Sequence, residues 1–182
     1  MKKTKSWYLC ILAVICSILP LYVYGQDAQR APIDVNLIID GSNAYNDVRD
    51  EISAWLSGRL DQILMDGDRV TIWSAGPTAR VVYSGVVTGS SERDAVKRSI
   101  RELAVSGNTA DFSGALNEAA GRQSSGFSYT LLISASPHSI TGNAANHLRH
   151  SRVEEFTNWR ALVVGLNLDT RVRRAANSFM GS

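Results

Sequence analysis

The sequence predicts an α/β domain with a Rossmann-like, three-layer architecture, in which helices cover both faces of a mostly parallel sheet. Short apolar runs rich in β-branched residues alternate with amphipathic stretches along most of the chain, which is typical of parallel strands joined by helices. The first run, 33–39, ends abruptly at Asp40. A turn of hairpin length, 75–78, separates two later runs, so we expect one edge strand to be antiparallel.

Each element is predicted from its apolar periodicity. The predicted strands are 37–39, 70–73, 81–83, 130–133 and 161–164. All are of the buried, parallel kind except the antiparallel edge strand, 81–83. The predicted helices are 46–65, one that opens at Ser91 with a capping-type start, 113–122, 144–150 and 170–179. The helix that opens at Ser91 is expected to have a looser apolar face, formed by Ala95, Ile100, Leu103 and Ala104.

The first 25 residues have the composition of a secretory signal. Three lysines lie within the first five residues, a run of 18 almost wholly apolar residues follows over 7–24, and the small residue Gly25 suits a cleavage site. An uncleaved anchor is the alternative, because a run of this length is close to the minimum that spans a bilayer. We therefore predict a signal over 1–25, a linker over 26–32, a domain over 33–180, and a location in the bacterial periplasm, at the cell surface or outside the cell.

The composition of the exported chain bears on two functions, cysteine chemistry and nucleic-acid binding. Both cysteines, Cys10 and Cys16, lie within the predicted signal, so the mature protein would have neither a disulfide nor a thiolate metal site. Cleavage would leave 157 residues, a single-domain length, with 16 basic and 17 acidic side chains. This near-neutral balance gives no support for a nucleic-acid partner.

Three motifs, in this order and spacing, resemble the von Willebrand factor type A domain. They are 40–44 (DGSNA), 64–72 (LMDGDRVTI) and 107–116 (GNTADFSGAL), and the resemblance covers 33–179. It implies a metal-ion-dependent adhesion site at the strand C-termini. In that family an Asp-x-Ser-x-Ser loop, a Thr and a second Asp surround magnesium, and an acidic group of the partner completes the octahedron. Oxygen ligands of this kind suit magnesium.

This chain departs from the family pattern in all three loops. Asp40 and Ser42 match, but Ala44 stands at the second serine position. Thr109 is the natural threonine, although counting back from the following motif places Ala110 there. The third loop has no acid after its apolar strand. We therefore expect an incomplete site that binds magnesium weakly or not at all.

The residues around this incomplete site are expected to form the binding surface. They are Asn43, Asp111, Ser134, Ser136 and His138. Asp40, Ser42 and Asp111 also have structural interpretations that involve no binding. Asp40 or Ser42 can accept backbone N–H bonds in a strand-to-helix turn, and Asp111 is favoured as the N-cap of the following helix.

A second resemblance suggests an enzyme. The stretch 37–43 is similar to the first motif of PIN-like nucleases of the NYN type, in which aspartates at strand ends hold magnesium for phosphodiester cleavage. The later strands, however, are followed by Ser134-Ala135 and Gly165-Leu166 rather than by acids. The preferred prediction is an exported, non-enzymatic module that binds another protein through its loops, by way of an acidic side chain if metal is retained. The membrane would be involved only through an uncleaved N-terminal segment.

Overall fold

The computed structural model describes residues 30–122, 128–135 and 151–164. Contacts divide the chain into two units, and the second, Pro32–Ser182, contains every helix and strand described here. The predicted signal and the predicted helices 144–150 and 170–179 lie outside the described residues. Within the described part of the chain, no helix has the length and apolar character needed to cross a membrane.

A six-stranded sheet with the order β3-β2-β1-β4-β6-β5 forms the centre of the second unit. The strands are β1 (Asp34–Asp40), β2 (Arg69–Ala75), β3 (Ala79–Val86), β4 (Ser128–Ser134), β5 (Ser151–Glu155) and β6 (Arg160–Val164). The helices are α2 (Tyr45–Ile63), α3 (Ser90–Arg101) and α4 (Phe112–Gly121). The central strand, β1, pairs in parallel with β2 on one side and with β4 on the other.

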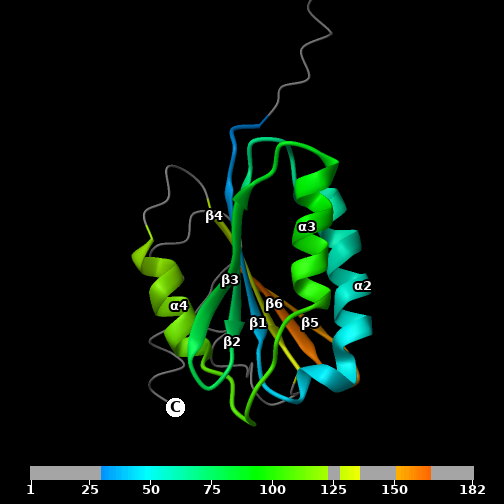
Figure 1. The fold of residues 1–182 in the computed structure, drawn as a ribbon, viewed down its shortest axis with the longest axis vertical. Coiled ribbons are helices and arrows are strands. Elements are labelled where there is room, and N and C mark those ends of the chain that lie inside the picture. The colour runs from blue at the N-terminus through cyan, green and yellow to red at the C-terminus, as the bar shows by residue number, and fades with distance from the viewer. Residues whose placement is uncertain (1–29, 123–127, 136–150, 165–182) are drawn as a thin grey trace, which may run out of the picture. The chain divides into compact units, whose positions relative to one another are not determined.

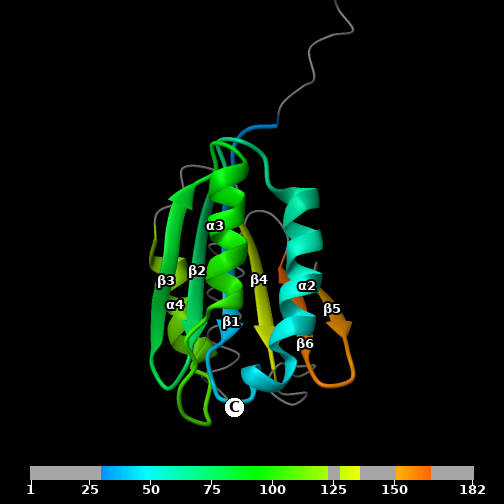
Figure 2. The same cartoon turned by 45° about the vertical axis from the view of Figure 1, so that its right-hand side comes forward.

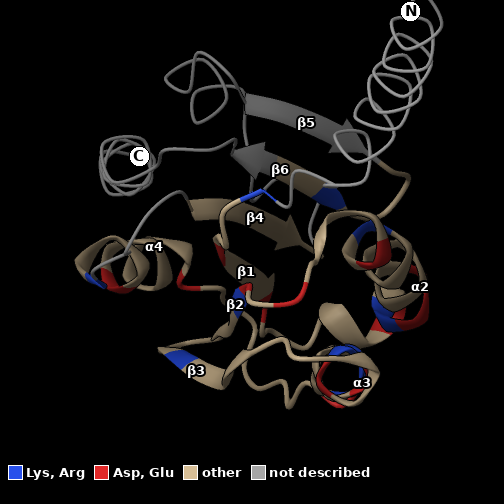
Figure 3. Cartoon of the chain, turned by 90° about the horizontal axis from the view of Figure 1, so that it is seen from above, with Lys and Arg blue, Asp and Glu red and all other residues tan. Residues whose placement is uncertain are grey.

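Helices cover both faces of this sheet. Figures 1 and 2 show α2 and α3 side by side on one face, and the view along the strands in Figure 3 places α4 on the other. The side chains of β1 explain this arrangement, because they alternate between the two faces. Leu37 and Ile39 join the core beneath α2 and α3, whereas Ile38 joins the core beneath α4. The predicted three-layer α/β class is confirmed.

The directions of the outer strands agree with the prediction at one edge and differ at the other. The edge strand β3 is antiparallel to β2, as predicted. The prediction that 161–164 is a parallel strand was wrong, because β6 is antiparallel to β4 and to the unpredicted strand β5. A short turn between β5 and β6 reverses the chain, with the Phe156 N–H donating to the Trp159 carbonyl at 3.0 Å. The apolar composition of a strand does not encode its direction.

The turn between β5 and β6 also forms an aromatic cluster with α2. The rings of Phe156 and Trp159 stack with centroids 3.7 Å apart. Trp55 of α2 meets both rings nearly edge-on, at 5.7 and 5.3 Å. These contacts attach the turn to the helical layer.

The helices begin close to their predicted positions, but their inward faces differ in part. Helix α3 begins at Ser90, after Gly89, without a side-chain capping bond. Its buried residues are Val96 and Ile100, whereas Ala95 of the predicted apolar face is only partly buried. Val96 and Ile100 are four residues apart and therefore lie on one face of the helix.

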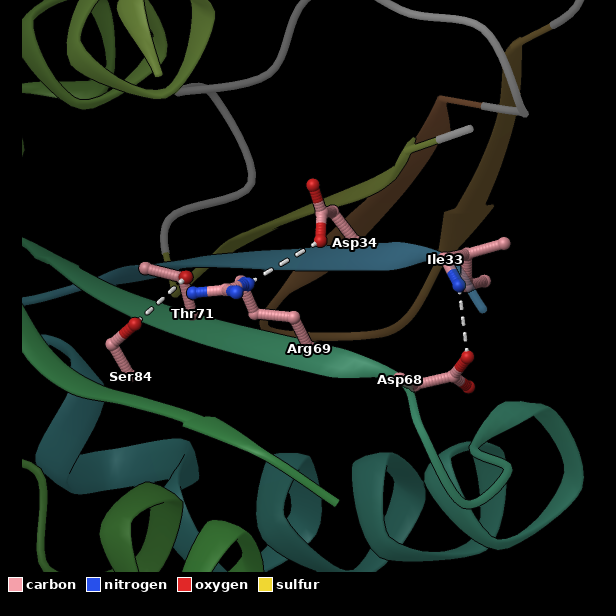
Figure 4. Close-up of polar contacts among 6 residues, drawn as sticks. All are labelled: Ile33, Asp34, Asp68, Arg69, Thr71 and Ser84. Atoms are coloured by element: carbon pink, nitrogen blue, oxygen red, sulfur yellow. Dashed lines mark hydrogen bonds and ion pairs between the residues drawn. The ribbon is translucent and has the colours of Figure 1, made fainter. Parts of the chain in front are cut away.

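A buried aspartate joins the start of β1 to the turn before β2. Asp68 has no exposed surface. Its Oδ1 accepts a hydrogen bond from the Ile33 N–H at 3.0 Å (Figure 4), and its Oδ2 accepts one from the Met65 N–H at 2.8 Å. One carboxylate thus connects two segments that are far apart in sequence.

Candidate functional site

The candidate site is the loop face, which we define as residues 41–44, 76–78, 102–111 and 135. These residues follow the C-terminal ends of β1, β2, α3 and β4. Figure 2 shows the turn after β1 and the loop before α4 at the same lower end of the sheet. In parallel α/β sheets, ligands bind at this end of the strands.

Asp40 lies beneath the loop face and connects two strands. It is 1 % exposed. Its Oδ1 accepts a hydrogen bond from the Ser42 N–H at 2.9 Å, and its Oδ2 accepts one from the Ala135 N–H at 3.0 Å. Both carboxylate oxygens are therefore used by backbone donors. Helix α2 has Ala44 as its N-cap without a side-chain capping bond, so Asp40 stabilises the turn and not the helix terminus.

Backbone hydrogen bonds join the loop between α3 and α4 to the turn after β1. The Asn43 N–H donates to the Gly107 carbonyl at 2.8 Å, and the Ser106 N–H donates to the Gly41 carbonyl at 2.9 Å. Gly41 is required where the same turn passes the end of β2, because a Cβ there would lie 2.8 Å from the Gly76 backbone nitrogen. The loops are therefore fitted to one another at backbone distance.

The exposed part of the loop face carries amide and hydroxyl groups. The Asn43 side-chain amide donates to the Asn108 side-chain oxygen at 3.3 Å, and both residues are exposed. Thr109 is also exposed. Ser42 and Ser134, by contrast, are buried beneath the surface. Ser136 and His138, which were predicted to belong to this surface, lie outside the described residues.

The structure confirms the prediction that Asp111 caps the helix that follows it. Its Oδ1 accepts a hydrogen bond from the Gly114 N–H at 2.8 Å, which makes it the N-cap of α4. Its own N–H donates to the Gly76 carbonyl at 2.8 Å. Asp111 therefore fastens the end of the 102–111 loop to the turn after β2.

Two residues of the first turns of α2 support the loop face from below, and sequence reasoning missed both. The Arg49 guanidinium donates to the carbonyls of Arg101 and Leu103 at 2.7 and 2.9 Å. The Tyr45 hydroxyl donates to the Ile100 carbonyl at 3.1 Å. Arg49 also lies over the Tyr45 ring, 4.9 Å from its centroid. Both residues thus bind the C-terminal carbonyls of α3, where the 102–111 loop begins.

Tyr45 has an altered acidity for a clear physical reason. Its side chain is completely buried, and this burial raises the pKa of its hydroxyl because the charged phenolate loses its hydration. The only sequence signal for this pair was a tyrosine and an arginine four residues apart. That spacing places them on one face of a helix but does not say what they bind.

The residues that the structure describes do not fit the ion site of the family that the sequence resembles. They contain no group of three or more His, Cys, Asp or Glu side chains that could hold a metal ion. Asp40 already accepts two N–H bonds, Asp111 caps a helix, and Ala44 has no side-chain oxygen. Magnesium binds proteins through one or two carboxylates in a near-ideal octahedron, which this donor set does not provide.

Comparison with known proteins finds similarity only among solved structures. No protein-family model matches the chain, and no curated protein matches it. A von Willebrand factor type A structure from Catenulispora acidiphila is 23% identical, with a TM-score of 0.40, over 50% of this chain and 22% of that one.

Two structures of the type V pili tip protein Mfa5 from Porphyromonas gingivalis are also similar. The three N-terminal domains of Mfa5 are 20% identical, with a TM-score of 0.41, over 61% of this chain and 22% of that one. The vWF domain of Mfa5 is 18% identical, with a TM-score of 0.40, over 61% of this chain and 42% of that one. The chain spans less than half the length of each of these structures, and the likeness concerns the fold alone.

Proposed function

We propose that this chain is an exported, non-enzymatic module that binds another protein through its loop face, in the manner of an adhesion or scaffold domain. The observation that carries the proposal is the way in which separate loops are fastened into one surface. Asn43, Asn108 and Thr109 are exposed on that surface, and backbone bonds beneath them hold two of the loops together. Binding residues are commonly found on loops that a rigid scaffold positions.

The chemistry of the loop face supports binding rather than phosphodiester cleavage. A magnesium-dependent nuclease needs several carboxylates free to hold the metal. Among the described residues, Asp40 is the carboxylate at the end of β1, and both its oxygens accept backbone hydrogen bonds. The exposed amides and hydroxyls suit hydrogen bonding to a partner surface. Export is supported by the signal-like composition of residues 1–25.

A site-directed crosslinking experiment tests the proposal in the cells that make the protein. A photoreactive phenylalanine analogue replaces Asn108 on the loop face in the full chain. In a matched control it replaces Gln62, which is exposed on α2 near the opposite end of the helix. We expect position 108 to crosslink to a defined protein outside the cytoplasm, and position 62 not to do so.

Three results would contradict the proposal. Position 108 could give no crosslink, or the same crosslinks as position 62, and either would show that the loop face is not the contact surface. Magnesium-dependent cleavage of single-stranded RNA by the purified chain, lost in Asp40→Ala, would instead support the nuclease.

A further inference from the structure

We infer that hydrogen bonds made by protein side chains hold the loop face in place where the resembled family uses an ion, and we call this set of bonds the lock. Binding at this face is therefore independent of divalent cations. The lock is a property of the free chain. The statement about binding rests on the proposed function. The inference follows from three parts of the molecule, which are the carboxylate of Asp40, the matching carboxylate of Asp68, and the guanidinium of Arg49.

Asp40 fastens β1 to the segment after β4. Its two N–H donors, from Ser42 and Ala135, come from different loops, and the Ala135 donor lies 95 residues away in sequence. Hydrogen bonds to a carboxylate are stronger than those between neutral groups. A cation at Asp40 would share the single negative charge of the carboxylate with both amides, which weakens its attraction for the cation.

Asp68 shows that this chain uses the same device away from the family's ion site. It lies at the opposite end of β1 and is also buried. It accepts N–H bonds from Ile33 and Met65, two segments that are distant in sequence, at 3.0 and 2.8 Å. A buried aspartate that binds two backbone amides therefore fastens each end of β1. Asp68 lies away from the loop face, so we assign a structural role to this arrangement at both ends of β1.

Arg49 supplies a fixed positive charge beneath the loop face. Its guanidinium binds the carbonyls of Arg101 and Leu103, at the C-terminal end of α3. A cation is favourable at a helix C-terminus because the unpaired carbonyls there carry partial negative charge. The 102–111 loop starts at this point and returns to the turn after β1 through Asn43 and Ser106. Arg49 is therefore a positioning residue for the loop face.

The test measures amide hydrogen exchange and paramagnetic broadening by NMR on the purified full chain, with the metal alone as the probe. In excess chelator, we expect the Ser42 and Ala135 amides to exchange slowly. Millimolar magnesium should change neither their exchange nor the melting temperature. Manganese should leave both resonances unbroadened. Selective broadening of these two resonances by manganese, or a magnesium-induced rise in melting temperature, would overturn the lock.

Variants separate the two parts of the lock. Asp40→Asn should speed exchange at Ala135 by about tenfold, the scale of one lost charge-assisted hydrogen bond, while the amides of Ile33 and Met65 on Asp68 stay protected. Arg49→Gln should speed exchange at Ser106 and leave the sheet amides unchanged. Unchanged exchange at these positions would overturn the inference. The manganese titration of the unaltered chain needs no variant, so the test stands even if Asp40→Asn does not fold.

The statement about binding is tested separately by repeating the position 108 crosslink with chelator. We expect the crosslink to persist. Its loss in chelator would overturn ion-independent binding, even if the free chain keeps its protected amides. Failure of position 108 to crosslink under any condition would contradict the proposed function, whereas the exchange data would still decide the lock.

Discussion

At the scale of single residues, local interactions were predictable from the sequence and distant ones were not. Asp111 was favoured as a helix cap, and the structure confirms this, because a cap binds an amide only three residues away. Asp40 was identified as important, but its role was left open. Its partner Ala135 is 95 residues away, and Arg49 binds carbonyls 52 and 54 residues away. Such bonds depend on the finished fold, which one sequence does not display.

The buried hydroxyl of Tyr45 predicts a specific loss of stability at high pH. Because burial raises its pKa in the folded state, the folded chain keeps this proton after the unfolded chain has lost it. The stability is complete below the unfolded pKa of about 10 and falls above it, by up to about 1.4 kcal/mol per pH unit. Urea unfolding at pH 8 and above pH 10 should show a steeper fall for the unaltered chain than for Tyr45→Phe. Equal slopes would show that Tyr45 does not titrate differently on folding.

At the scale of elements, the sequence predicted where strands and helices lie better than how the outer strands run. The central apolar runs became β1, β2 and β4 because their residues are buried on both faces. Strand β5 was missed because its sequence, 151–155, has a single apolar residue and no alternation. The reversed direction of β6 depends on the turn that precedes it.

The buried residues of the α2–α3 pair should contribute far more to the stability of the fold than its ion pairs do. Lys97 of α3 pairs with Asp61 of α2 at 2.6 Å, but the Asp61 side chain is 55% exposed. Ile100 of α3 is buried in the core that α2 and α3 cover. We expect Ile100→Ala to lower the free energy of unfolding by about 2–5 kcal/mol and Lys97→Ala by less than about 1 kcal/mol. Urea denaturation measures both, and a larger loss from Lys97→Ala would contradict this ranking.

At the scale of the whole second unit, two apolar cores share one sheet. The three-layer class was predictable because continuous apolar runs require cover on both faces. Leu37 and Ile38 are neighbours in β1, both with no exposed surface, but they belong to different cores. Neither layer can therefore lose its packing without weakening the strand that the other layer needs.

Because both cores include side chains of β1, we expect substitutions on its two faces to cause similar losses of stability. Leu37→Ala and Ile38→Ala should each lower the free energy of unfolding by about 2–5 kcal/mol, through lost burial and the cavity that remains. Val82→Ala, on the edge strand and 36% exposed, should change it by less than about 0.5 kcal/mol. Circular dichroism and fluorescence should report one coincident transition for each variant. A second transition in either core variant would show that the two cores unfold independently.

The aromatic cluster at the β5–β6 turn gives the protein its own spectroscopic reporter. Trp55 and Trp159 belong to different layers, and their ring centroids are 5.3 Å apart. Indole rings held in a fixed asymmetric setting produce near-ultraviolet circular dichroism, which disappears when packing loosens even if secondary structure remains. The signal from this pair therefore reports whether the β5–β6 hairpin stays packed against α2. Loosening of that edge of the sheet would be visible in solution without any label.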